Sequence, residues 1–173
     1  MKLRELFDKW SLSKLKINAH FVEIEFEPND QDKDAAWAMY VELLTRITTQ
    51  VLPAGQGDEA TALASVHKLF GITREILRAP GARHADKFAK VAIVILNQKV
   101  RPFTAHWHQA MLDHAFDNRA ECQRFRAELA ALQAVLTNYA GVLSDLVGVE
   151  DLTKRLLGGI CGQIPSYFRR SCC

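Results

Sequence analysis

One apolar pattern near the end of the chain constrains its fold more than any other feature. Between about residues 118 and 147, large apolar side chains recur at alternating spacings of four and three positions. They are Phe125, Leu129, Leu132, Leu136, Tyr139, Leu143 and Leu146. Such spacings place every member on one side of an α-helix, as in the seam of a coiled coil. The pattern therefore predicts a long helix that packs either inside a bundle or against a second chain.

Four earlier segments also have helical periods or helix end signals. They are residues 2–10, 30–51, 58–77 and the stretch from about residue 84 onward. The second carries an apolar stripe made of Trp37, Tyr40, Val41, Leu44, Ile47 and Val51. The last is apolar nearly all round, which is typical of a central helix, and Pro102 predicts a kink or a restart within it.

Residues 15–27 have a different period. Apolar and polar side chains alternate along this stretch, with a slip of one position between Phe21 and Val22. Such alternation predicts one or two short strands, and the slip predicts a bulge or a turn. We therefore predict a mainly α-helical single domain over residues 1–157, a bundle of about five helices with a small β element at residues 15–27. Residues 158–173 have no period and are predicted to form a flexible tail.

Composition and charge favour a soluble protein of the cell interior. With 173 residues and a net charge of +2, the chain is long enough for one core and too weakly charged to imply a polyanionic partner. The most apolar run, Val91 to Leu96, is far shorter than a membrane span. The four cysteines form no Cys-x-x-Cys pair, and Cys172 and Cys173 follow two arginines, where palmitoylation is the alternative to a free tail. We expect a cytoplasmic protein of bacterial type without a membrane span.

Three aspartates at alternating positions raise the question of a calcium loop. Asp30, Asp32 and Asp34 have the opening spacing of such a loop. The sixth position, which needs glycine, is an alanine, and the twelfth, which needs glutamate, is a valine. We therefore predict a helix start, with Asn29 or Asp30 as the N-cap and the following acids stabilised by the helix dipole.

The histidines and Cys122 are the remaining residues that could bind a metal or act as a nucleophile, and their positions do not favour either role. His106 and His108 are two positions apart and so point to opposite sides of a helix, whereas zinc ligands on one helix are three or four apart. Only His106, Asp113 and, loosely, His114 share a side, and a site there would need further ligands from elsewhere. Cys122 lies within a predicted helix, without the helix N-terminus that would activate its thiol. We therefore predict no catalytic residues, no bound metal and no cofactor.

Charge is unevenly distributed along the chain. Residues 23–34 hold six acids and one lysine, whereas residues 68–101 hold eight bases and two acids. A candidate anion or nucleic-acid face consists of Arg74, Arg78, Arg83, Lys87 and Lys90. Two basic helical faces on either side of a short loop are one way to bind phosphates. The alternative is a solvated face that meets the acidic stretch within the molecule or across a dimer.

These observations favour a non-enzymatic protein–protein interaction or oligomerisation module, which binds a protein partner or a second copy of itself. The candidate interaction seam consists of Phe125, Leu129, Leu132, Leu136, Tyr139 and Leu143. An unpaired edge in the strand segment and the two charged stretches are further contact surfaces. The second expectation is a nucleic-acid or nucleotide-binding domain that uses the basic face. The third is an enzyme with an unrecognised or metal-assisted site.

Overall fold

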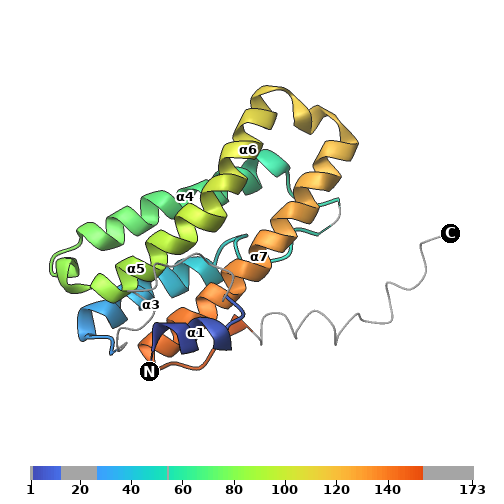
Figure 1. The fold of residues 1–173 in the computed structure, drawn as a ribbon. Helices are drawn as coiled ribbons and strands as arrows, with labels where there is room; N and C mark the ends of the chain where they lie inside the picture. Colours follow the sequence, from blue (N-terminus) through green and yellow to red (C-terminus); the bar gives the residue numbers. More distant parts are fainter. Residues whose placement is uncertain (1, 13–26, 54, 154–173) are drawn as a thin grey trace.

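The structure, a computed structural model, describes residues 2–12, 27–53 and 55–153. In chain order, its helical segments are α1 (Leu3–Lys9), α3 (Asp30–Leu44), α4 (Glu59–Arg78), the 3₁₀ turn η1 (Ala82–His84), α5 (Asp86–Ile95), the π turn η2 (Leu96–Val100), α6 (Arg101–Leu112), the 3₁₀ turn η3 (Ala115–Asp117) and α7 (Arg119–Val147). Figure 1 shows these helices lying along one another, with α7 beside α3 and α6.

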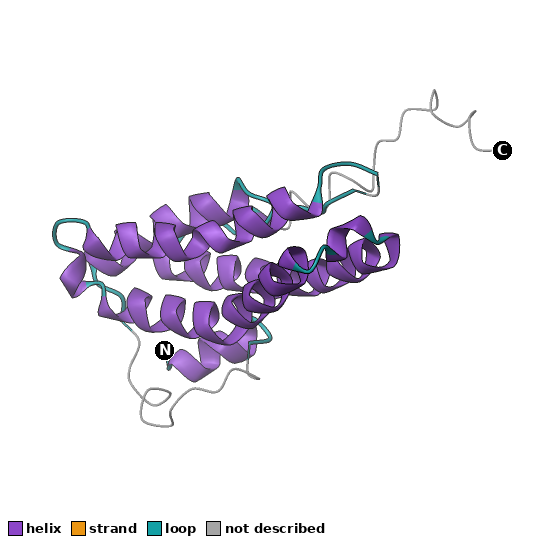
Figure 2. Ribbon diagram, turned by 90° about the horizontal axis from the view of Figure 1, so that it is seen from above, coloured by secondary structure: helices purple, strands orange, loops and turns teal. Residues whose placement is uncertain are grey.

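The prediction of a mainly α-helical fold is confirmed. The described residues form helices joined by loops and contain no strand (Figure 2). Of the predicted β element at residues 15–27, only Glu27 belongs to the described part, and the predicted tail at residues 158–173 lies wholly outside it. No helix in the described ranges has both the length and the apolar character needed to cross a membrane.

Segments α5, η2 and α6 follow one another without a break and form one curved rod (Figure 1). Counted as one helix, the rod makes five helices with the other four, as the sequence predicts. Pro102 lies at the start of α6, where an α-helical turn would bring its ring against the carbonyl four residues earlier. The wider π turn just before it relieves that clash. Arg101 accordingly keeps helical dihedral angles, φ −60° and ψ −49°, so the predicted kink or restart is a π turn within a continuous helix.

Helix α7 forms the centre of the core. It packs along α3 and also meets α4 and α6. Its heptad residues are at most 7% exposed, and Met39 and Leu43 of α3 bury their side chains in the same core. Burying a side chain of leucine size stabilises a fold by about 2 kcal/mol relative to leaving it exposed. The heptad pattern therefore packs the bundle of its own chain.

The short helix α1 is attached to the end of α7. Trp10, which follows α1, donates from Nε1 to Oδ2 of Asp145 at 2.6 Å. The ammonium group of Lys9 lies 2.7 Å from the same oxygen. The ring of Trp10 packs on the backbone of α7 at Gly141, where any Cβ atom would overlap the ring. A glycine at this position is what allows α1 to approach α7 so closely.

Two side chains of α7 hold the loop between α3 and α4. Nε of Arg126 donates to Oε1 of Glu59 at 2.6 Å, and its terminal nitrogens donate to three carbonyls within residues 53–57, at 2.8 to 3.3 Å. Nε2 of Gln133 donates to two carbonyls earlier in the loop, at 2.5 and 2.7 Å. These bonds satisfy backbone acceptors that have no helical partner and fix the start of α4 against α7.

Candidate functional site

The outer side of α3 carries two apolar side chains that the bundle does not cover. Trp37 is 47% exposed and Val41 is 39% exposed, and they lie about one helical turn apart. The sequence predicts both on the core-facing stripe of this helix, and for these two residues that prediction is wrong. The core side of α3 is centred on Ala36 and Leu43, so positions 37 and 41 point away from it. We call Trp37, Ala38 and Val41 the α3 face.

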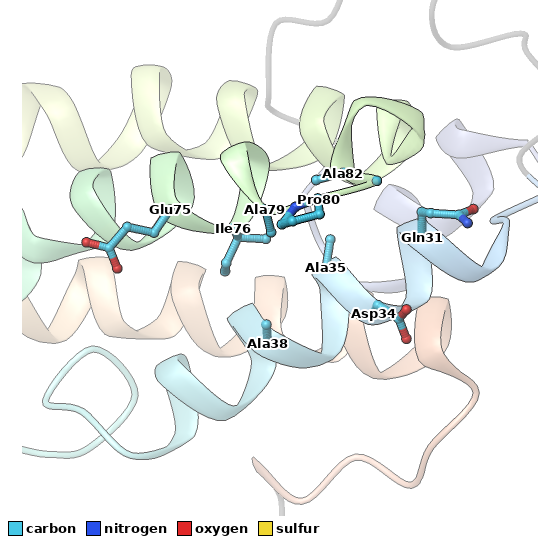
Figure 3. A pocket seen from close by; sticks show the side chains of 10 residues that line it. Gln31, Asp34, Ala35, Ala38, Glu75, Ile76, Ala79, Pro80 and Ala82 are labelled. Carbon is cyan, nitrogen blue, oxygen red and sulfur yellow. The ribbon is translucent and has the colours of Figure 1, made fainter.

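An apolar groove lies next to this face, between α3 and the end of α4. Its volume is about 360 Å³. It is lined by Gln31, Asp34, Ala35, Ala38, Glu75, Ile76, Ala79, Pro80, Gly81 and Ala82. In Figure 3, Ile76 and Pro80 face Ala35 and Ala38 across the hollow. We call it the α3–α4 groove, and Ala38 belongs both to it and to the α3 face.

The two ends of the groove are acidic. Glu75 lies at one end, and Asp34 lies with Gln31 at the other (Figure 3). Neither carboxylate has a hydrogen bond or an ion pair within the described part of the chain, whereas the neighbouring Asp30 has Nζ of Lys33 at 3.7 Å. The groove therefore combines apolar walls with unneutralised negative charge at each end.

Hydrogen bonds between distant segments hold the walls of the groove in place. Nδ2 of Asn29, at the start of α3, donates to the carbonyl oxygen of His84 at 2.8 Å. Gly81 adopts a left-handed conformation with φ +83°, which turns the chain from α4 into η1. Oδ1 of Asp32 accepts from the backbone nitrogens of Lys87 and Phe88, both at 3.0 Å. The groove is thus formed by the fold itself, before any partner binds.

The six residues of the predicted interaction seam lie together, but inside the molecule. Phe125, Leu129, Leu132, Leu136, Tyr139 and Leu143 are all buried against α3, α4 or α6. A stripe that already packs against its own chain is not free to bind another protein while the fold persists. An interaction surface must therefore be sought elsewhere on this bundle.

The structure does not bring the five residues of the predicted basic face together as free charges. Nζ of Lys87 lies 3.8 Å from the buried carboxylate of Asp32. Nζ of Lys90 is 2.8 Å from Oδ2 of Asp86, and Nε of Arg83 donates to the ring of its neighbour, His84. Arg74 and Arg78 are exposed on α4, with no ion pair among the described residues. Within the described part of the chain, Arg74, Arg78 and Arg83 therefore have no carboxylate partner.

The histidines and the cysteine of the described part also have local contacts. His106 lies 3.1 Å from a terminal nitrogen of Arg124, and Nδ1 of His114 lies 3.5 Å from Asp117. No three potential ligands among histidine, cysteine, aspartate and glutamate gather within the described residues. Burial raises the pKa of the Cys122 thiol, as does the nearby carboxylate of Glu59, so the nucleophilic thiolate is disfavoured.

Sequence reasoning missed the groove because its walls come from separate segments. The stretch Ala79–Ala82 has the small residues of a helix stop, and its role as a wall depends on where α3 lies. It also missed the contact between the rings of His67 and His108, whose centroids are 4.9 Å apart. The α3 face and the α3–α4 groove together form an exposed apolar surface on the folded chain.

In comparisons with known proteins, no family model matches the chain, and neither a curated sequence nor a solved structure is found to be similar to it.

Proposed function

We propose that this chain is a non-enzymatic protein-interaction module whose docking surface is the α3 face with the α3–α4 groove. One observation carries the proposal: a half-exposed Trp37 stands beside an apolar groove of about 360 Å³ that no part of the described chain fills. Exposed tryptophans are enriched at protein interfaces and are frequent among the residues that dominate binding energy. A rigid apolar hollow beside such a residue accepts an anchoring side chain of a partner.

The shape of the surface favours a helical partner segment. The walls near α3 consist of the methyl groups of Ala35 and Ala38, which allow the backbone of another helix to come close. The groove has room for one or two large apolar side chains, and the α3 face extends the apolar contact by another helical turn. An amphipathic helix that places anchors three or four positions apart matches this spacing.

The charges of the surface favour a basic partner over a second copy of this chain. Asp34 and Glu75 lie at opposite ends of the groove and have no ion pair with any described residue, so a partner with lysine or arginine on either side of its apolar anchors is complementary. A two-fold pairing of this face with itself would bring the same carboxylates of two chains to one interface, where like charges repel. The proposed occupant is therefore an amphipathic basic helix of another protein.

The experiment compares capture by three forms of the full chain. The forms are the natural chain, Ala38→Glu, which fills the groove and adds a negative charge, and Ala64→Glu, the same change at an exposed position of α4 outside the groove. A partner captured by the first and third forms but not by the second is purified and titrated against each. We expect Trp37→Ala to weaken its binding by about thirtyfold, the loss typical of a dominant interface residue.

Two results would contradict the proposal. The first is a partner that binds Ala38→Glu and Trp37→Ala as tightly as it binds the natural chain, because its site then lies elsewhere. The second is a homodimer in light scattering that Ala38→Glu dissociates, because the surface then binds a second copy. Self-association that none of these variants changes leaves the surface free and points to a different dimer contact.

A further inference from the structure

A second hollow, separate from the groove, lies between α4 and α6. Its volume is about 230 Å³. It is lined by His67, Phe70, Arg74, Arg101, Thr104, Ala105 and His108. The lining contains two guanidinium groups and two imidazole rings, and it contains no carboxylate. It shares no residue with the α3–α4 groove. We call it the α4–α6 cleft.

The two arginines are available to a ligand in different ways. The guanidinium of Arg101 lies 5.0 Å from the ring centroid of Phe70, and its Nε donates to Oδ1 of Asn97 at 3.0 Å. These contacts fix the plane of the group, and its terminal nitrogens have no partner among the described residues. Arg74, on the opposite helix, has no hydrogen bond or ion pair in the described part. Two positive charges thus line one cleft without a counter-ion, which is unfavourable until an anion binds.

The two histidines add a contribution that depends on protonation. Their rings meet edge to face, with 4.9 Å between centroids and 71° between planes. Burial lowers the pKa of His108, and the charge of His67 lowers it further. Thr104, by contrast, uses its hydroxyl proton internally, since Oγ1 lies 3.0 Å from the carbonyl oxygen of Val100. The donors available to a ligand are therefore the guanidinium groups and the imidazoles, each of which donates from one ring nitrogen when neutral and from both when protonated.

We propose that the α4–α6 cleft binds a phosphate-type oxyanion, with Arg74 and Arg101 as the principal donors and the His67–His108 pair as proton-dependent donors. The planar guanidinium fork matches the oxygen spacing of a phosphate and binds it through two parallel hydrogen bonds. Two permanent positive charges with titratable neighbours suit a dianion better than a single carboxylate. At ~30 Å³ per water molecule, the cleft displaces several waters, enough for a phosphate group with a small organic substituent.

A small phosphate ligand fits the surrounding surface better than a polynucleotide does. A nucleic acid needs a row of unmatched bases along its backbone. On the predicted basic face, Lys87 and Lys90 already have carboxylate partners at 3.8 and 2.8 Å. Of the other three members of that face, Arg74 lines the cleft, Arg78 lies one helical turn beyond it, and Arg83 donates to the ring of His84, so the five residues do not form a continuous row of free bases. This inference is independent of the proposed protein-interaction function, because the two surfaces share no residue.

The test titrates the purified full chain with inorganic phosphate and with glycerol phosphate, at constant ionic strength and at pH 6.5, the ordinary pKa of histidine. Heat of binding is measured together with the ring resonances of His67 and His108. We expect saturable binding of one anion per chain and a rise in the pKa of His108. Arg74→Ala and Arg101→Gln should each weaken binding by about tenfold or more, because each removes charge-assisted hydrogen bonds.

The control is Arg78→Ala, which removes the same charge from the same helix but not from the cleft. It should change the affinity by no more than about twofold, since an exposed charge outside the site acts only through a screened field. Arg101→Gln keeps a side chain over Phe70, and circular dichroism verifies that both cleft variants are folded.

Four results would overturn the proposal. No saturable binding up to roughly 50 mM phosphate rejects the site, because such a titration detects millimolar affinities. An equal loss of phosphate affinity in Arg78→Ala and Arg74→Ala means that the anion is attracted by the general positive charge of the helix and not by a defined site. Acetate that binds as tightly as phosphate rejects the assignment to phosphate. An oligonucleotide that binds far more tightly, and is weakened alike by Arg74→Ala and Arg78→Ala, assigns the surface to nucleic acid.

Discussion

The carboxylate of Asp32, in the first turn of α3, caps the helix that begins at Asp86 by accepting a hydrogen bond from the backbone nitrogen of Phe88. That bond and the one from Lys87 are both 3.0 Å long, and both end on Oδ1. Oδ2 accepts from the backbone nitrogen of Asn29 at 3.1 Å and completes a capping box. The residue before α5 is Ala85, whose side chain has no acceptor. One buried carboxylate therefore caps two helices and joins them.

Replacing this carboxylate is expected to destabilise the fold strongly. In Asp32→Ala, the backbone donors of both helix starts lose their acceptor, and Asp32 is 0% exposed, so water does not replace it readily. We expect a loss of about 3 kcal/mol in the free energy of unfolding, measured by urea denaturation. Asp34→Ala, in the same turn but exposed, should cost less than about 0.5 kcal/mol. Similar losses in the two variants would contradict this role for Asp32.

Two glycine-to-alanine replacements are expected to act in opposite directions. In Gly141→Ala, the new methyl group overlaps the ring of Trp10, so α1 must move away from α7. Helix propensity favours alanine by about 1 kcal/mol, but overpacking typically costs 1–3 kcal/mol, and we expect a net loss of about 1 kcal/mol. In a Trp37→Phe background the emission comes from Trp10 and the buried Trp107, and it should shift to longer wavelength as the ring of Trp10 loses Asp145.

Gly71→Ala is the matched control for this overlap. Gly71 lies within α4, and a Cβ atom there meets nothing within 4 Å. The same change should therefore stabilise the chain by about 0.5–1 kcal/mol. If thermal unfolding shows both alanine variants to be more stable than the natural chain, then α1 is not docked on Gly141 as the structure shows.

The sequence predicts most of the helices because their signals are local. Asn29 as an N-cap, the acidic start of α4 and the heptad pattern of α7 each depend on residues within a few turns. The end of α3 shows where local signals fail. The helix ends at Leu44, several residues before the predicted end. The hydroxyls of Thr48 and Thr49 both donate hydrogen bonds to the carbonyl oxygen of Leu43, at 3.1 and 2.6 Å. These hydroxyls replace the backbone donor that a continuing helix would supply to that carbonyl oxygen. The apolar stripe continues beyond residue 44 and so gives no sign that the helix ends there.

The surfaces proposed for binding were harder to predict, because each is made of segments far apart in the chain. Trp37 fits the helical spacing of the apolar stripe in residues 30–51. Its exposure depends on where α7 and α4 stop covering α3. His67 and His108 meet only because α4 and α6 lie side by side. The charge pattern counts both Arg74 and Arg101 among its eight bases, but the predicted basic face includes only Arg74, because Arg101 enters the cleft from the other helix. Periodicity predicts which side of a helix is apolar, whereas tertiary packing decides how much of that side is covered.

Two tyrosines are expected to respond oppositely to loss of their hydroxyl group. The hydroxyl of Tyr139 is buried without a hydrogen-bond partner among the residues that the structure describes, and burial raises the pKa of this group. Tyr139→Phe removes an unsatisfied polar atom and keeps the ring, so we expect a gain of about 1 kcal/mol in stability. The hydroxyl of Tyr40 accepts from the backbone nitrogen of Leu152 at 2.8 Å, and Tyr40→Phe should cost about 1 kcal/mol. Urea denaturation of the two variants checks both signs, and a loss in Tyr139→Phe would reveal a partner for that hydroxyl.

The histidine pair in the α4–α6 cleft predicts a specific dependence of stability on pH. Burial, and then the charge of His67, lower the pKa of His108 below its ordinary value of 6.5. As the pH falls through 6.5, the unfolded chain takes up a proton at this position before the folded chain does, so acid favours unfolding. The stability that depends on neutral His108 is therefore complete above pH 6.5 and is lost as the pH falls through the lowered pKa.

We expect His108→Gln to lose less stability than the natural chain when the pH is lowered from about 8 to about 5, in the absence of phosphate. Urea denaturation at each pH measures this difference, from which the carboxylates common to both proteins cancel. His67→Gln removes only the smaller cause of the lowered pKa of His108. Its loss of stability on acidification should therefore lie between that of the natural chain and that of His108→Gln. Identical losses in the natural chain and in His108→Gln would show that the ring of His108 is not held neutral by this cleft.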